Sequence, residues 1–266
     1  MDLSVIIPAY NCGSFLEKSL SSLLAYLPTL NMQSEVILVN DGSEDNTAEV
    51  AARFHVKLID FTENRGKGAA IRAGMAEATG KVRIYTDADL PYGLEVLPLM
   101  AFYIRERKFH AVIGNRNVAG SVYSDRIPIT RQAMSKVCSL IVGMLVAGGY
   151  HDTQCGLKAF EGKVADSLFR ISRIDRFACD VEYIYLLLCH SLDIKHIPVQ
   201  LAANYGSSVR FFSDSIRFLR DLARIVYYRH SKTYHSAYLE NLFTQEHGEN
   251  LVRAAWDFAR GEDGES

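Results

Sequence analysis

The chain has 266 residues, 48% of them hydrophobic, and a formal net charge of −2. This length and hydrophobic content predict a folded globular protein with a sizeable core. The near-neutral charge argues against a general attraction to nucleic acid or to anionic lipid, so any basic surface must be local.

The amino-terminal sequence lacks the ordered basic, hydrophobic and small-residue regions of a signal peptide, so we expect a cytoplasmic protein. No uncharged apolar stretch approaches the ~20 residues of a spanning helix, and the closest is 137–149. The cysteines include no C-x-x-C pair, and we expect reduced thiols at Cys12, Cys138, Cys155, Cys179 and Cys189.

Short apolar segments alternate with amphipathic ones in the first half of the chain. This alternation predicts an α/β fold, with a mostly parallel central sheet flanked by helices. The expected strands are 4–8, 35–40, 56–60, 82–86 and 111–114, and the expected helices are 13–27, 46–54, 68–78 and 94–106.

The pattern changes after Arg116. The expected elements there are a helix near 131–146, the segment 156–160, a helix near 181–191, a strand near 194–199 and an amphipathic helix near 210–229. The last of these has apolar residues on one face and arginines on the other, which is typical either of a core-packed helix or of a helix at a membrane surface. Residues 230–266 are predicted to form a polar tail with one weak helical pattern near 251–258.

Polar residues follow three of the expected strands. The first strand ends in Pro8, Ala9, Tyr10 and Asn11, the second in 40–43, and the fourth in 86–89, which include Asp87, Ala88 and Asp89. Ligands of open parallel sheets bind at this carboxyl edge. Asp87 and Asp89 are spaced to hold a hard, oxygen-preferring cation such as Mg²⁺ or Mn²⁺, which could also bind diphosphate oxygens. An isolated pair of this kind is more often two solvated turn residues.

The segment 64–72 follows the third strand and opens a helix. Its glycines permit close backbone approach, and Lys67 with the helix amino terminus attracts anionic oxygen, so a phosphate-facing loop is expected. The segment fits neither the P-loop nor the complete dinucleotide-binding fingerprint. Nucleotide hydrolases and dehydrogenases are therefore disfavoured.

The motifs SVIIPAYN at 4–11, VNDGS at 39–43, NRGKG at 64–68 and DAD at 87–89 together resemble family 2 glycosyltransferases of the GT-A fold. Further along, GNR at 114–116, Arg131 with Ser135, and DTQCGLK at 152–158 resemble the subgroup that glycosylates polyprenyl phosphates. That subgroup includes dolichyl-phosphate glucosyltransferase and dolichyl-phosphate mannose synthase. The resemblance covers roughly residues 3–229.

The resemblance implies one GT-A domain at 1–229, with a nucleotide-sugar donor half at 1–115 and an acceptor half at 116–229. The implied donor-binding residues are Pro8, Ala9, Tyr10, Asn11, Asp41, Lys67, Gly68, Asp87, Ala88 and Asp89. Of these, Asp87 and Asp89 would hold the metal and diphosphate. Arg116, Arg131 and Arg210 would face the acceptor phosphate, where a planar guanidinium can bind two oxygens. Ordinary surface arginines are the alternative.

Two departures from the family pattern affect the prediction. Leu90 and Pro91 occupy the place where the mannose synthase branch often has a glutamine near the metal, so the sequence identifies no third protein ligand for the metal. No Q-x-x-R-W motif follows, which favours transfer of one sugar over processive synthesis. Asp180 lies at the start of an expected helix, either as a general base or acceptor-positioning residue, or as a residue favoured there by the helix dipole.

The resulting hypothesis is an inverting, metal-dependent transfer of one hexose from a nucleotide sugar to a polyprenyl phosphate, with UDP-glucose favoured over GDP-mannose. We expect the enzyme to act at the cytoplasmic face of a membrane, to which it would attach peripherally. The main alternative is a soluble hydroxyl acceptor with Asp180 as the base. A nucleotidyltransferase is disfavoured because no glycine-rich loop follows the first strand, and a non-catalytic binding module because Asp87 and Asp89 are both present.

Overall fold

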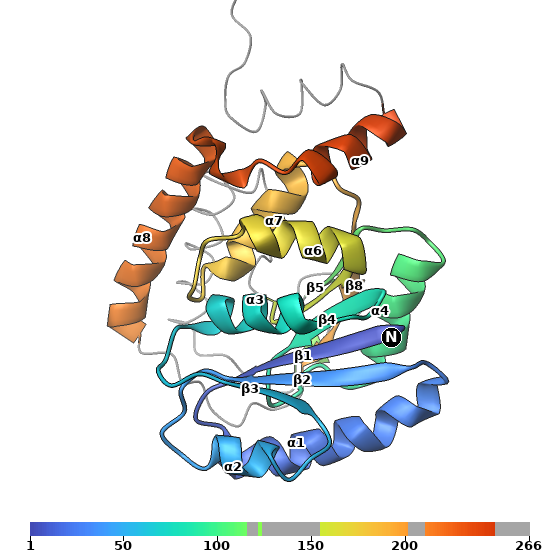
Figure 1. Ribbon diagram of the computed structural model, residues 1–266, viewed down its shortest axis with the longest axis vertical. Helices are drawn as coiled ribbons and strands as arrows, with labels where there is room; N and C mark the ends of the chain where they lie inside the picture. The colour runs from blue at the N-terminus through green and yellow to red at the C-terminus, as the bar shows by residue number, and fades with distance from the viewer. Residues whose placement is uncertain (116–121, 124–154, 202–210, 248–266) are drawn as a thin grey trace, which may run out of the picture.

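The computed structural model describes residues 1–115, 122–123, 155–201 and 211–247 (Figure 1). Its main element is a seven-stranded sheet with the order β3-β2-β1-β4-β7-β5-β8. The strands are β1 (Leu3–Ala9), β2 (Ser34–Asn40), β3 (Lys57–Asp60), β4 (Val82–Thr86), β5 (Ala111–Asn115), β7 (Leu157–Glu161) and β8 (Ile194–Pro198). Two further short strands, β6 (Val122–Tyr123) and β9 (Gln200–Leu201), form a separate parallel pair.

Helices cover both faces of the sheet. They are α1 (Gly13–Tyr26), α2 (Thr47–Ala51), α3 (Lys67–Glu77), α4 (Val96–Arg105), α6 (Gly162–Ile171), α7 (Cys179–Cys189), α8 (Phe211–His230) and α9 (Ala237–His247), with short 3₁₀ helices η1 (Leu27–Leu30) and η2 (Lys232–Tyr234). In Figure 1, α3, α6 and α7 lie above the sheet and α1 and α2 below it. The predicted α/β fold with a mostly parallel sheet flanked by helices is confirmed.

Strand β1 shows why the sheet is buried on both faces. Ile6 contributes to the core under α3, α6 and α7, while Val5 and Ile7 contribute to the core under α1 and α4. All three side chains are fully buried. An apolar run without polar alternation is typical of a parallel strand that has helices on both sides.

One strand is reversed. β7 runs antiparallel to its neighbours β4 and β5, whereas the other pairs in the sheet are parallel. Because of this reversal, the residues that enter β7 lie at the carboxyl edge of β4. β7 and β8 come from the second half of the chain, so both halves share one sheet.

The segment after His230 differs from the expected polar tail. Its described part contains η2 and α9, and the side chains of Tyr234 and Leu239 are buried in the same core as α6 and α7. Tyr234 donates a hydrogen bond of 2.7 Å from its hydroxyl to Glu182 Oε1. Tyr234 and Leu239 lie in a mostly polar segment, so the sequence pattern does not predict this contact with the core.

Helix α8 matches the expected amphipathic helix and packs on the core. Leu222 and Ile225 are buried, whereas Arg217 and Arg220 are exposed. Within the described residues, no helix combines the length and apolar character needed to span a bilayer.

The buried His190 gives a prediction for stability. Burial lowers its pKa to about 4, although a hydrogen bond of 3.1 Å between its Nε2 and the Tyr234 carbonyl oxygen opposes the shift. A histidine in the unfolded chain titrates near ~6.5. The unfolded state therefore takes up the proton first, and this stabilisation is present above that pH and lost as the pH falls towards 4.

We expect this loss to amount to about 3 kcal/mol, from ~1.4 kcal/mol per pKa unit. The measurement is urea unfolding between pH 7 and 4 for the wild type and His190→Gln, whose amide can still donate to Tyr234 without titrating. Equal losses of stability in the two proteins would contradict the prediction.

Candidate active site

Three polar loops meet at the carboxyl edge of the sheet. β1 pairs in parallel with both β2 and β4, and Ala9 is opposite Asn40. The residues that follow these strands therefore come together, as predicted from the positions of Tyr10, Asp41 and Asp87.

The loops after β1 and β2 are joined by side-chain hydrogen bonds. The backbone N–H of Asn11 donates to Ser43 Oγ at 2.9 Å, and the side-chain Oδ1 of Asn11 accepts from the backbone N–H of Glu44 at 2.8 Å. Pro8 is partly buried and Ala9 is buried, whereas Tyr10 is 39% exposed. Asn11 thus shapes the edge, and Tyr10 presents an aromatic side chain to solvent there.

Asp41 organises the loop that leads into α3. Its Oδ1 accepts from the Arg65 amide at 2.7 Å, and its Oδ2 accepts from the Gly66 amide at 2.9 Å and from Asn64 Nδ2 at 3.0 Å. Burial raises the pKa of Asp41, although the two backbone donors oppose this shift. Its contact with a nucleoside stays a prediction.

Lys67 is the first residue of α3 and lies between two carboxylates. Its Nζ is 2.9 Å from Asp87 Oδ1 and 3.4 Å from Asp180 Oδ2. Burial alone would lower the pKa of Lys67, but the charges of Asp180 and Asp87 raise it above the usual value. The lysine is therefore a fixed cation at this edge.

Glycines allow this approach. A Cβ on Gly68 would overlap the Ile174 carbonyl oxygen and the Cys179 side chain, and a Cβ on Gly66 would overlap the Asp175 carbonyl oxygen. Gly66 also has a φ of 105°, which disfavours other residues. The amino end of α3 is thereby packed against the segment that leads into α7.

Asp87 and Asp89 are suited to a divalent cation. The Asp87 side chain is 36% exposed. Partial burial raises the pKa of Asp89, and the nearby charge of Asp87 adds to the shift. Two close carboxylates of like charge supply hard oxygen ligands of the kind that Mg²⁺ and Mn²⁺ prefer. Among the described residues, no cluster of three His, Cys, Asp or Glu side chains forms a complete protein ligand set.

Gly156, just before the reversed strand β7, lies against this pair. A Cβ added to Gly156 would overlap the carboxylate of Asp87. The Gly156 amide donates to the Tyr92 hydroxyl at 3.2 Å. The Asp87 side chain is therefore bounded by Lys67 on one side and by the Gly156 backbone on another.

Asp180 lies in the first turn of α7, and its side chain is 4% exposed. Its Oδ1 accepts from the Tyr85 hydroxyl and the Lys158 ammonium. Burial would raise its pKa, but the charges of Lys158 and Lys67 outweigh burial and lower it. A carboxylate with a lowered pKa and three cationic or hydroxyl partners is a weak base.

The neighbouring Glu182 has a different environment. It accepts from the Arg173 and Ile174 amides at 2.6 and 3.0 Å and from Tyr234. It therefore holds the segment before α7 to the carboxy-terminal part of the chain.

The acceptor-side arginines Arg116, Arg131 and Arg210 lie outside the described residues, and their roles stay predictions.

Two residues that contact Asp180 had no predicted role, namely Tyr85 and Lys158. A sequence signal existed for Lys158, because a lysine within an apolar strand is unusual unless it is paired.

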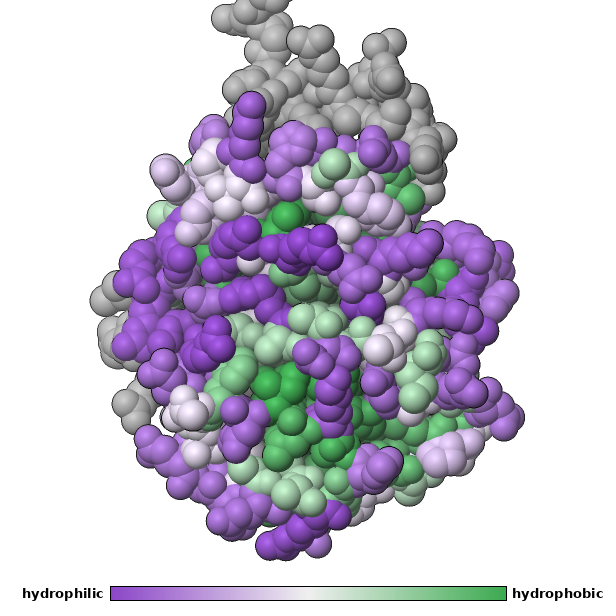
Figure 2. Space-filling view, viewed as in Figure 1, coloured by the Kyte–Doolittle hydropathy of each residue, from purple (hydrophilic) through white to green (hydrophobic). Residues whose placement is uncertain are grey.

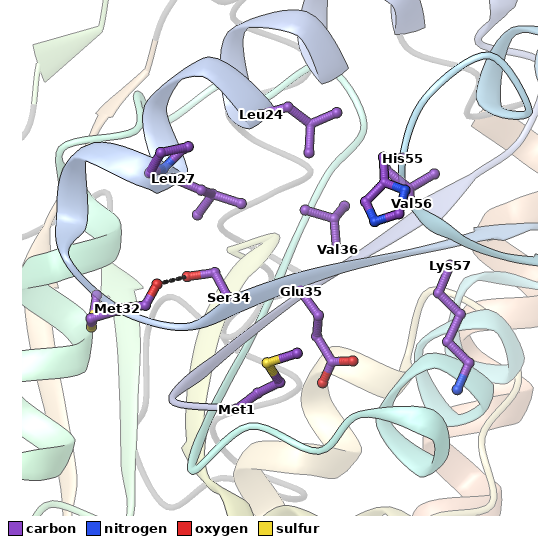
Figure 3. Close-up of a pocket in the computed structure, with 11 residues that line it drawn as sticks. Met1, Leu24, Leu27, Met32, Ser34, Glu35, Val36, His55, Val56 and Lys57 are labelled. Atoms are coloured by element: carbon purple, nitrogen blue, oxygen red, sulfur yellow. Dashed lines mark hydrogen bonds between the residues drawn. The ribbon is translucent and has the colours of Figure 1, made fainter.

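Figure 2 shows apolar residues gathered over the edge of the sheet at β2 and β3. Nearby, a surface hollow lies at the amino ends of these strands and is lined by Met1, Leu24, Val36, Val56 and Lys57 among others (Figure 3). It is at the opposite end of the parallel strands from Asp87. The hollow is therefore separate from the candidate site.

Comparison with known families decides the class of this site. The model of "Glycosyl transferase family 2" matches residues 4–166, more than half of the chain. The chain belongs to this glycosyltransferase family. The match includes the loops after β1, β2 and β4, as the sequence motifs predicted.

The similar proteins include the dolichyl-phosphate beta-glucosyltransferase of Drosophila melanogaster, 32% identical over 243 residues that cover 85% of this chain and 74% of the relative. The Homo sapiens enzyme of the same name is 30% identical over 246 residues, covering 83% and 73%. Together with the family match, these relatives confirm the predicted hexosyltransferase class.

Among solved structures, glucosyl-3-phosphoglycerate synthase from Mycobacterium tuberculosis, in complex with Mn²⁺, UDP-glucose and phosphoglyceric acid, has a TM-score of 0.64. It is 17% identical and the match covers 84% of this chain and 78% of that chain. Mannosyl-3-phosphoglycerate synthase from Rubrobacter xylanophilus has a TM-score of 0.58 at 15% identity, covering 86% and 74%. These likenesses show a shared fold, and the predicted GT-A fold of this family 2 glycosyltransferase is confirmed.

The packing of Gly156 on Asp87 predicts a sensitive position. Gly156→Ala should displace the Asp87 carboxylate, and a shift of about 1 Å at a reacting centre can cost about a hundredfold in rate. We expect weaker Mn²⁺ binding in calorimetry and slower glycosyl transfer.

The matched control is Gly74→Ala, whose Cβ would overlap Ile6 in the core instead. That variant should lose stability while its folded fraction keeps Mn²⁺ affinity. Equal Mn²⁺ affinity in wild type and Gly156→Ala would refute the assignment of Asp87.

Proposed function

We propose that this glycosyltransferase moves one glucose from UDP-glucose to a polyprenyl phosphate, with inversion at the anomeric carbon. The relatives named dolichyl-phosphate beta-glucosyltransferases support both the sugar and the acceptor. UDP-glucose is α-linked, so a β-linked product is what an inverting displacement gives. The solved structures of the same fold that contain UDP or UDP-glucose support the uridine donor.

A divalent cation, Mg²⁺ or Mn²⁺, would be held by Asp87 and Asp89. When bound, it would neutralise charge on the departing diphosphate. Lys67 supplies a second positive charge at the same edge, beside Asp87. Tyr10, Asp41 and the neighbouring Pro8–Asn11 segment would line the nucleoside pocket.

The state of Asp180 is the observation that carries the choice of acceptor. A hydroxyl acceptor needs a base to remove its proton, and Asp180 is buried, ionised and already bonded to Tyr85, Lys158 and Lys67. A phosphate monoester has a second pKa near ~6 and arrives largely ionised at neutral pH. Phosphate therefore fits a site that lacks an available base at this position.

In the proposed reaction, an acceptor phosphate oxygen attacks the anomeric carbon while the bond from that carbon to the diphosphate oxygen breaks. No covalent enzyme intermediate forms. Alignment of the two substrates and stabilisation of leaving-group charge would supply most of the rate enhancement. The alternative hydroxyl acceptor draws support only from the fold shared with phosphoglycerate-using synthases.

We also propose that the enzyme works at a membrane surface on the cytoplasmic side. The long hydrocarbon chain of the acceptor would lie in a lipid bilayer, so the enzyme would meet the acceptor phosphate at the bilayer surface. On α8, Leu219 is 50% exposed and Tyr227 is 67% exposed, beside the exposed Arg217 and Arg220. Apolar and cationic side chains together suit a lipid–water interface.

The test is a transfer assay with UDP-glucose or GDP-mannose as donor, and a short-chain polyprenyl phosphate, phosphoglycerate or free glucose as acceptor. We expect β-glucosyl polyprenyl phosphate from the first donor and first acceptor, and none after chelation of divalent cations. Asp89→Asn should abolish this product while the protein stays folded, because Asp89 would be a metal ligand. Glucosylation of hydroxyl acceptors alone would overturn the proposal.

The roles of Arg116 and Arg131 have a separate test. A charge-assisted contact to phosphate is worth roughly 1.5–3 kcal/mol, which corresponds to about ten- to a hundredfold in acceptor binding. Arg131→Ala should show this loss in kinetics with the polyprenyl phosphate varied, and an almost unchanged affinity for UDP. Unaltered acceptor kinetics in both Arg116→Ala and Arg131→Ala would remove them from the acceptor site.

A further inference from the structure

Two residues deep in the sheet converge on the carboxylate of Asp180. Tyr85 on β4 and Lys158 on β7 are directly opposite each other in the antiparallel register. The Tyr85 hydroxyl and the Lys158 ammonium both donate to Asp180 Oδ1. Lys158 also donates to the Cys155 carbonyl oxygen at 2.8 Å, and its Nζ lies 5.5 Å from the centre of the Tyr85 ring.

This group of side chains lies out of solvent. The side chain of Lys158 is 0% exposed and that of Asp180 is 4% exposed. A buried ion pair gains little net stability, because removing both charges from water offsets their attraction. A well-packed apolar pair would stabilise this part of the core at least as well. Stability alone therefore gives no reason for charges at these positions.

The second oxygen of Asp180 is directed at the site. Asp180 Oδ2 is 3.4 Å from Lys67 Nζ, which is itself 2.9 Å from Asp87 Oδ1. Lys67 is thus shared between a buried carboxylate and a carboxylate suited to metal. Without Asp180, the charge of Lys67 would be balanced by Asp87 alone among these contacts.

We propose that Tyr85 and Lys158 are positioning residues for glycosyl transfer. They fix Asp180 so that its second oxygen shares the ammonium group of Lys67 with Asp87, which leaves more of the negative charge of Asp87 for the cation. Asp180 acts in this arrangement as a fixed counterion. The location of the cation rests on the proposed function, whereas the hold on Lys67 follows from the contacts themselves.

A double substitution separates positioning from charge. Asp180→Asn alone removes one negative charge near the site. It would therefore weaken cation binding through net charge, whether or not Asp180 positions Lys67. Lys158→Met combined with Asp180→Asn removes one charge of each sign, so the net charge stays that of the wild type. The asparagine oxygen can still accept from Tyr85. The ionic hold on Lys67 is lost, together with the hydrogen bond from Lys158 to the Cys155 carbonyl oxygen.

The experiment measures thermal unfolding, Mn²⁺ affinity by electron paramagnetic resonance without donor, and transfer kinetics. Asp180→Asn leaves the buried Lys158 without its carboxylate, and Lys158→Met leaves Asp180 with only Tyr85 and the more distant Lys67. The melting temperature of each single variant should therefore fall by roughly 6–20 °C. The double variant should recover most of this loss. Its Mn²⁺ affinity and its kcat should nevertheless stay about ten- to a hundredfold below wild type, the factor for one charge-assisted contact.

Glu182→Gln is the matched control, because it alters another buried carboxylate of the same helix turn that does not pair with Lys67. It should lower stability and leave the Mn²⁺ affinity of the folded protein unchanged. A double variant that regains wild-type Mn²⁺ affinity together with stability would overturn the positioning role. Since Mn²⁺ affinity is measured without sugar donor or acceptor, failure of the proposed substrates would appear separately, in the transfer assay of the wild type.

Discussion

The ammonium group of Lys67, shared by Asp87 and Asp180, joins the two halves of the chain at the candidate site. Lys67 reaches this place because α3 begins there, and α3 can begin there only because Gly66 and Gly68 let its first turn touch the segment before α7. Asp41 fixes the same loop from the other side by accepting its backbone donors. The start of α3 thus determines at once how the two segments pack, how the loop is held and where the charge of Lys67 lies.

The reversed strand β7 supplies the second constraint. In a fully parallel sheet, the chain would enter this position from the amino edge, far from Asp87. Reversal instead places Gly156 against Asp87 and puts Lys158 opposite Tyr85. A polar network inside a sheet requires that every member has a partner, since a buried charge without one is costly. The register of β7 meets that requirement.

Much of the fold and part of the site could be predicted from local sequence. The strand ends at Asp41 and Asp87 and the helix start at Lys67 are encoded within a few residues each. The Lys158–Asp180 pair could not be predicted, because it depends on which strand is reversed and on how α7 docks. The Tyr234–Glu182 contact joins residues 52 positions apart through a segment of polar composition, which periodicity does not reveal.

These constraints bear on the chemistry that the site can support. Asp180 lies at the start of α7, where the sequence suggested a general base. The lysines that keep its carboxylate ionised also lower its pKa, and so its affinity for a proton. A site can keep a carboxylate charged and oriented, or keep it basic and available, and burial beside two lysines selects the first. With Asp180 held in this way, a nucleophile that brings its own negative charge suits the site. A phosphate acceptor does so, and the lysine that Asp180 holds remains at the edge where the diphosphate would leave.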